Sequence, residues 1–143
     1  RTHGLGKQFN GLIKGFGLAR GSVACSAAWD TSDIVVVGAN DADMACAVNR
    51  LADMQGGAAL SEGGRILTEV PLPIFGLASD LPVAALAARL EGLKQAMARL
   101  GVAFPDPLLS LNTLTGAAIP YLRICEEGLV NLKDGKTLGL FAP

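Results

Sequence analysis

The sequence predicts a single domain of the α/β (α+β) class, with a mixed β-sheet, hairpins and two main helices packed on the sheet. Three observations carry this prediction: a β-branched apolar run, two stretches with apolar residues at helical spacing, and short Gly-bearing connections between apolar stretches. The 143 residues are enough for one buried core but too few to form two domains easily. We therefore expect one domain over residues 1–143.

The first two predicted elements are a strand and a helix. Residues 34–37 form the apolar run, and Gly38 ends it, so we expect a buried strand that lies centrally in the sheet. Asn40 or Asp41 can then cap a helix that ends at residues 56–57, both glycine. Its apolar positions share one face: Met44, Val48 and Leu51.

A hairpin and an extended connector follow. Residues 58–61 and 65–70 flank the short segment 62–64, which contains two glycines and suits a hairpin turn. This hairpin provides a second edge of the sheet. Residues 71–74 contain two prolines that cannot donate hydrogen bonds, so we expect a connector there instead of a central strand.

The second helix is long and amphipathic. We expect a Ser79 or Asp80 cap, Pro82 in the first turn, and an end at Gly101. Apolar residues recur at spacings of four and three: Leu86, Leu90, Leu93, Met97 and Leu100. Near the end of the chain, residues 133–136 contain Asp-Gly between alternating apolar residues, which predicts a second hairpin.

Composition argues against two kinds of partner. The formal net charge is −1, so the chain lacks the basic excess that neutralises phosphates or anionic lipid, and we expect neither nucleic acid nor a membrane as a partner. Charged residues make up 17% of the chain, against about 25% in typical soluble domains. A surface this short of charge suggests cover by another domain or subunit, such as a homo-oligomer. A lone Ala- and Gly-rich monomer is the alternative.

The chain carries no sign of export. Its longest uncharged stretch, 107–122, is shorter than the roughly 20 residues of a membrane-spanning helix. The beginning has neither Met nor the layout of a signal peptide, so we expect an interior start. Cys25, Cys46 and Cys125 are odd in number and widely spaced, which favours a reduced, cytoplasmic setting.

Residues for catalysis or metal binding are scarce. His3 is the only histidine, and no nucleophile, carboxylate pair or ligand cluster forms a complete catalytic centre. We therefore expect no metal site within this chain. The glycines of segment 15–21 match neither a dinucleotide fingerprint nor a P-loop, and a structural turn is the better interpretation.

The richest polar cluster, residues 29–33, comes directly before the predicted strand. Its short side chains can hydrogen-bond the backbone of a turn, which is the simpler interpretation. The functional interpretation is that Asp30, Ser32 and Asp33 face a pocket at the end of the sheet. The single Trp29 is expected to serve packing.

Several stretches together resemble the C-terminal domain of adenine deaminases, in the metal-dependent amidohydrolase superfamily. Order and spacing hold across nearly the whole chain. The stretches that carry the resemblance are Gly11-Leu12-Ile13-Lys14-Gly15-Phe16-Gly17-Leu18, Ile34-Val35-Val36-Val37-Gly38, Asp43-Met44-Ala45, Ala47-Val48-Asn49-Arg50, Leu72-Pro73-Ile74 with Gly76-Leu77 and Ser79, and Pro105-Asp106-Pro107.

The resemblance implies the hydrolytic deamination of adenine to hypoxanthine and ammonia. It implies a catalytic barrel domain upstream that holds a divalent metal pair, iron or manganese, and for which this chain is an accessory partner. The family tends to carry His-Asp-Ser-His-Asn where this chain has residues 29–33. Asp30 is kept, whereas Trp29 and Ser32 replace histidines, so adenine and a diverged substrate both stay open.

Two other functions fit the residues. A stand-alone regulatory module would bind a small molecule with residues 29–33, and an initiator Met close to Arg1 would favour it. A dimerisation domain would tolerate replacement of Asp30 and respond to changes on its apolar surface.

Overall fold

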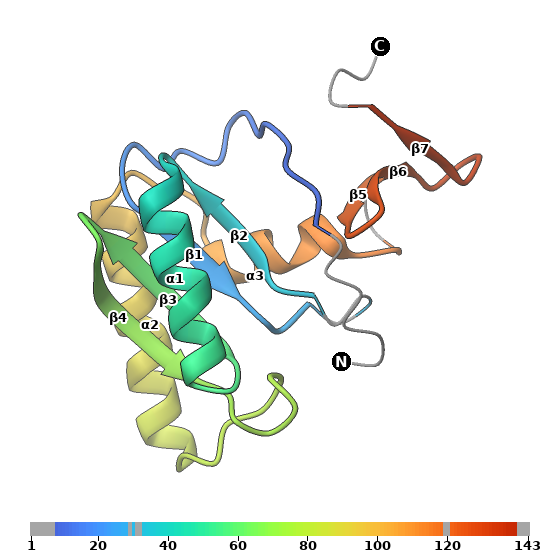
Figure 1. The fold of residues 1–143 in the computed structure, drawn as a ribbon. Helices are drawn as coiled ribbons and strands as arrows, with labels where there is room; N and C mark the ends of the chain where they lie inside the picture. The colour runs from blue at the N-terminus through green and yellow to red at the C-terminus, as the bar shows by residue number, and fades with distance from the viewer. Residues whose placement is uncertain (1–7, 29, 31–32, 119–120, 140–143) are drawn as a thin grey trace.

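The structure is a computed structural model that describes residues 8–28, 30, 33–118 and 121–139. Its centre is a four-stranded sheet in the order β2-β1-β3-β4 (Figure 1). The strands are β1 (Ser22–Cys25), β2 (Val35–Gly38), β3 (Gly57–Glu62) and β4 (Arg65–Pro71). The α+β class is confirmed. The strand pairs in the described residues are all antiparallel, and they form two sheets instead of one mixed sheet.

Helices cover both faces of the central sheet. Helix α1 (Asp41–Asp53) packs on one face, where Ala24 and Ala59 meet Ala47 and Leu51. The other face carries the larger core, which helices α2 (Val83–Arg99) and α3 (Pro107–Asn112) cover. Figure 1 shows α1 in front of the sheet and α2 behind it. Successive strand residues point to opposite faces, so each central strand supplies both cores.

The predicted strand at 34–37 exists as β2, but its expected central place is wrong. β2 is an edge strand, and β1 and β3 lie in the middle of the sheet. Helices contact β2 on both sides, α1 from one and α3 from the other. The apolar run therefore indicates that both faces of this strand are covered by other elements. It does not indicate whether the strand has a hydrogen-bonded neighbour on each edge.

The two main helices are confirmed, with one boundary corrected. Asn40 is the N-cap of α1, and its side chain accepts a hydrogen bond from the Asp43 backbone N at 2.9 Å. The second helix starts at Val83 with Pro82 as its N-cap and without a side-chain cap. Ser79 instead accepts a hydrogen bond from the Leu81 backbone N at 3.2 Å, within the preceding turn.

Helix α2 is buried mainly in its second half. Leu93, Met97 and Leu100 of the predicted stripe are in the core, and Leu86 packs partly against it, whereas Leu90 is exposed. The charged residues that lie off the apolar stripe of this helix are all exposed: Arg89, Glu91, Lys94 and Arg99.

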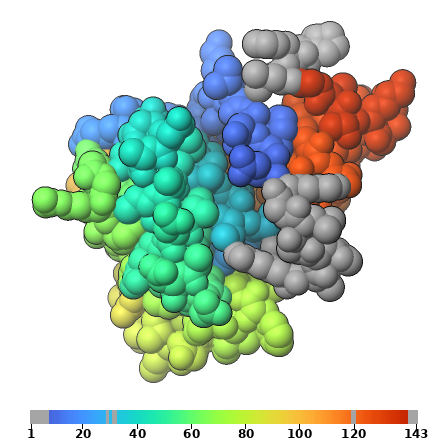
Figure 2. Space-filling view, viewed as in Figure 1, coloured from blue at the N-terminus to red at the C-terminus, as the bar shows by residue number. Residues whose placement is uncertain are grey.

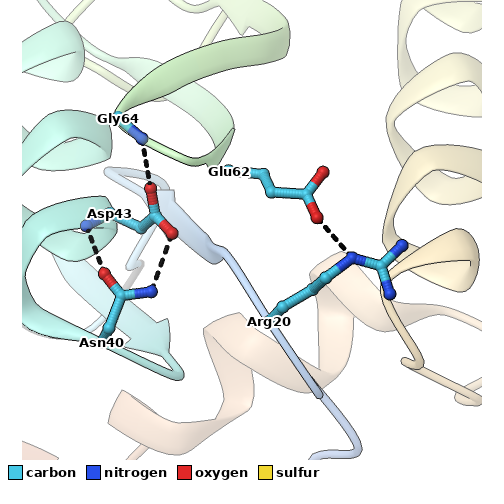
Figure 3. Close-up of polar contacts among 5 residues, drawn as sticks. All are labelled: Arg20, Asn40, Asp43, Glu62 and Gly64. Atoms are coloured by element: carbon cyan, nitrogen blue, oxygen red, sulfur yellow. Dashed lines mark hydrogen bonds and ion pairs between the residues drawn. The ribbon is translucent and has the colours of Figure 1, made fainter.

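The hairpin of β3 and β4 is confirmed, and its tip is fastened to α1. The buried Asp43 carboxylate accepts hydrogen bonds from the Gly64 backbone N and from Asn40 Nδ2, both at 2.8 Å (Figure 3). These donors lower the pKa of Asp43, with the Gly64 hydrogen bond the largest cause. On the other side of the hairpin, Glu62 forms an ion pair with Arg20.

A second sheet and a short helical stretch complete the chain. Helix α3 leads into a 3₁₀ turn, η1 (Thr113–Thr115), and then into strands β5 (Leu122–Cys125), β6 (Gly128–Asn131) and β7 (Lys136–Leu138). The predicted hairpin at 133–136 joins β6 to β7, with Asn131 opposite Lys136. This small sheet stands to one side of the main body (Figure 2).

Candidate functional site

The candidate site is the connection from β1 to β2, residues 26–34, which contains the polar cluster predicted from the sequence. Asp30 is exposed and Asp33 is half-buried. Ser32, the third predicted pocket-facing residue, lies outside the described residues, as do Trp29 and Thr31. The structure therefore places two of the three predicted side chains, and it buries them to different extents.

Asp30 holds a distant segment of the chain. Its Oδ2 atom accepts a hydrogen bond from the Ala117 backbone N at 2.6 Å. Ala117 comes two residues after η1 and leads toward β5, so the carboxylate joins the β1–β2 connection to the approach of the second sheet. Because a charged acceptor makes a stronger hydrogen bond than a neutral one, this contact fixes the path of both segments. The partner is a backbone N outside the cluster's own turn, 87 residues along the chain.

Ser26 anchors the beginning of the connection. Its hydroxyl donates to the Gly76 carbonyl oxygen at 2.7 Å and accepts from the Gly57 backbone N at 2.8 Å. One side chain thereby links β1, the start of β3 and the loop that follows β4. Sequence reasoning missed this residue, because a lone serine after a strand carries no signal for partners so far along the chain.

The β1–β2 connection starts from a buried residue, Cys25. Cys25 ends β1 within the core, and its sulfur accepts a hydrogen bond from the Ala27 backbone N at 3.3 Å. Burial raises the pKa of the Cys25 thiol above its ordinary value. The thiol is therefore protonated and unreactive at neutral pH, and this cysteine serves packing rather than nucleophilic chemistry.

The donor set of the described residues does not fit a metal pair. Among residues 8–28, 30, 33–118 and 121–139, no three or more His, Cys, Asp or Glu side chains come together in a group that could hold a metal ion. His3 lies outside this set. Asp30 and Asp33 supply two carboxylates, one of which already accepts from Ala117. We accordingly derive no reaction step through a metal at this site.

A groove of about 490 Å³ lies between α2 and α3, away from the predicted cluster. Neither Asp30 nor Asp33 lines it. Its walls are mostly apolar and include Leu90, Leu93, Met97 and Leu109. The charged side chains of Lys94 on α2 and of Asp106 at the beginning of α3 also line it. Asp106 is also the N-cap of α3, where its Oδ1 accepts from the Leu109 backbone N at 3.0 Å, so its main role there is structural.

The fold and the site define a small three-layer α+β domain whose most polar loop is held in place by backbone contacts. The family model of the adenine deaminase C-terminal domain matches residues 1–136. The chain therefore belongs to the adenine deaminase C-terminal domain family, and the resemblance that the sequence suggested is confirmed.

Relatives named adenine deaminase agree in identity and coverage. One from Methylobacterium nodulans is 44% identical over 137 residues, which cover 96% of this chain and 24% of the relative. One from Desulfatibacillum aliphaticivorans is 43% identical over 99% of this chain and 25% of the relative. One from Kosmotoga olearia is 42% identical over 92% and 23%. The chain thus spans about a quarter of the length of these relatives.

No helix within the described part of the chain is long and apolar enough to cross a membrane.

Proposed function

We propose that this chain works as the C-terminal accessory domain of an adenine deaminase-like hydrolase in the cytoplasm. The reaction is the hydrolysis of adenine to hypoxanthine and ammonia, carried out by an upstream barrel domain that holds an iron or manganese pair. The whole of residues 1–143 forms the accessory domain. Its role is to pack on the catalytic domain, with the β1–β2 connection facing the mouth of the barrel.

One observation carries this proposal: relatives named adenine deaminase match nearly all of this chain but extend over about four times its length. Most of such a polypeptide therefore lies outside the matched region. The absence of a ligand cluster among the described residues agrees with chemistry that resides elsewhere in the protein. The low proportion of charged residues, 17%, agrees with a surface that is partly covered in the full-length protein.

The test is an assay of the full-length protein against a panel of purines. We expect ammonia release from adenine with hypoxanthine as the second product, and loss of turnover after metal removal. Turnover of a different purine in preference to adenine would replace the substrate and keep the accessory role. Turnover of adenine by residues 1–143 alone would overturn the proposal, because the chemistry would then reside in this chain.

The proposed position of Asp30 needs its own pair of variants in the full-length protein. Asp30→Asn keeps an oxygen that can accept from the Ala117 N, whereas Asp30→Ala removes it. If the carboxylate faces the reacting purine, both variants lower kcat/KM. If Asp30 acts only through the backbone contact, Asp30→Asn keeps most of the activity and Asp30→Ala loses stability.

A further inference from the structure

The loop that follows β4 presents apolar side chains at its tip. Phe75 is 94% exposed, and its neighbours Ile74 and Leu77 are 45% and 48% exposed. In Figure 1 the loop projects at the lower edge of the molecule, below α1. Three large apolar residues in four positions form a concentrated patch, whereas apolar residues exposed singly are ordinary on protein surfaces.

The backbone of this tip is strained and yet firmly held. Phe75 has a φ of 56°, in the left-handed region that bulky residues rarely adopt. The Ile74 and Ala78 backbones bond each other in both directions at 3.1 Å, and Ser26 fixes the Gly76 carbonyl. A Cβ at Gly56 would lie 2.5 Å from the Gly76 Cα, so the loop is pressed closely against the start of β3. The fold therefore holds the backbone of the tip in one geometry, from which the Phe75 side chain projects into solvent.

We infer that the loop tip formed by Ile74, Phe75 and Leu77 docks on the upstream domain of the same polypeptide, with Phe75 as the apolar anchor. This inference rests on the proposed function, because it takes the upstream domain as given. Residues of this kind, a rigidly presented aromatic among aliphatic neighbours, are typical anchors at interfaces.

The length of the relatives favours the upstream domain over a second copy of the chain as the partner of the loop tip. About three quarters of each relative lies outside the region that this chain matches. A domain joined by a short flexible linker has an effective concentration of roughly millimolar, far above that of a second free copy. An apolar tip is therefore covered first by the tethered domain.

Docking of the loop tip also affects where the candidate site lies. Ser26 binds the tip and lies four residues before Asp30 in the same connection. Docking through Phe75 consequently brings the β1–β2 connection to the edge of the same interface. The loop tip thus sets where residues 26–34 lie relative to the catalytic domain.

Photocrosslinking in the full-length protein tests the contact directly. The substitution is Phe75→p-benzoylphenylalanine. The control is Leu67→p-benzoylphenylalanine, since Leu67 on β4 is an apolar residue outside the tip that is 48% exposed, as Leu77 is. We expect position 75 to crosslink within one polypeptide to a peptide outside residues 1–143, and position 67 not to reach that peptide. Crosslinks between two copies, or only to residues within 1–143, would overturn the inference.

Hydrogen exchange of the full-length protein gives an independent measurement. In Phe75→Ser we expect amides of the upstream peptide identified by crosslinking to exchange about tenfold faster or more, because an aromatic anchor is lost. Leu67→Ser should leave them unchanged. Equal exchange in both variants would contradict the docking role. Crosslinking as expected without turnover of any purine would refute the proposed reaction alone, while turnover without the crosslink would refute the docking loop alone.

Discussion

Replacing Ser26 by alanine should destabilise the domain far more than an ordinary surface change. The substitution removes one hydroxyl that donates to the Gly76 carbonyl and accepts from the Gly57 N. Both glycines are buried, so water cannot readily replace the lost partner. A buried polar group left without a partner costs about 1–3 kcal/mol, and we expect a total of about 2 kcal/mol for the two, at the lower end because Ser26 itself is only half-buried.

The measurement is equilibrium urea unfolding of the 143-residue chain, followed by far-UV circular dichroism. With an m-value of about 2 kcal/mol/M for a domain of this size, the midpoint should fall by about 1 M at unchanged m. The matched control is Ser110→Ala on α3, whose hydroxyl donates only to the Asp106 carbonyl at 2.8 Å near the surface. That change should cost within about 0.5 kcal/mol.

Equal midpoints for the two serine variants would refute the reasoning. Such a result would mean that the Ser26 hydroxyl does not hold the loop after β4 to the sheet. The fixed presentation of Phe75 would then lose its cause, and docking through a rigid tip would lose its support.

Three further outcomes follow from the charged and thiol groups. Hydrogen bonds lower the pKa of Asp43 in the folded protein, so its contribution to stability is present above the ordinary aspartate pKa of about 3.9. This contribution is lost as the pH falls through the lower folded value. In Asp43→Asn, acid titration monitored by circular dichroism should lack this component of stability. Iodoacetamide should modify the half-exposed Cys46 before the buried Cys25, as peptide mass spectrometry would show, and the reverse order would contradict the packing described for Cys25. The isolated chain, dialysed after incubation with Mn²⁺ or Fe²⁺, should retain no stoichiometric metal by elemental analysis, and two tightly held ions would contradict the assignment of the metal pair to another domain.

Sequence patterns predicted the elements whose signals are local. The N-cap of α1, the glycine turn between β3 and β4, and the Asp-Gly turn between β6 and β7 each depend on a few adjacent residues, whereas α1 ends at Asp53, before the glycines that we expected to end it. The prediction failed where the decisive interaction was distant. β1 was missed because Ser22-Val23-Ala24-Cys25 has little β-branched character, although its residues are fully buried between two strands.

Other features were open to prediction and went unused. Asp106 followed by Pro107 is the pattern of an N-cap and first helical residue, and it begins α3, a helix that we did not predict. The partner of Asp30, by contrast, is 87 residues away and is a backbone N, which leaves no trace in the identity of the partner residue. The same holds for Ser26 and Gly76, so the geometry of the candidate site had to come from the structure.

The contact between Asp30 and Ala117 gives this aspartate a structural role that does not depend on the substrate. Its carboxylate joins the β1–β2 connection to the segment between η1 and β5, and this hydrogen bond is formed whatever the substrate. The contact of Asp30 therefore supports the architecture of the domain, and under the proposed function we expect the choice of substrate to lie in the upstream domain.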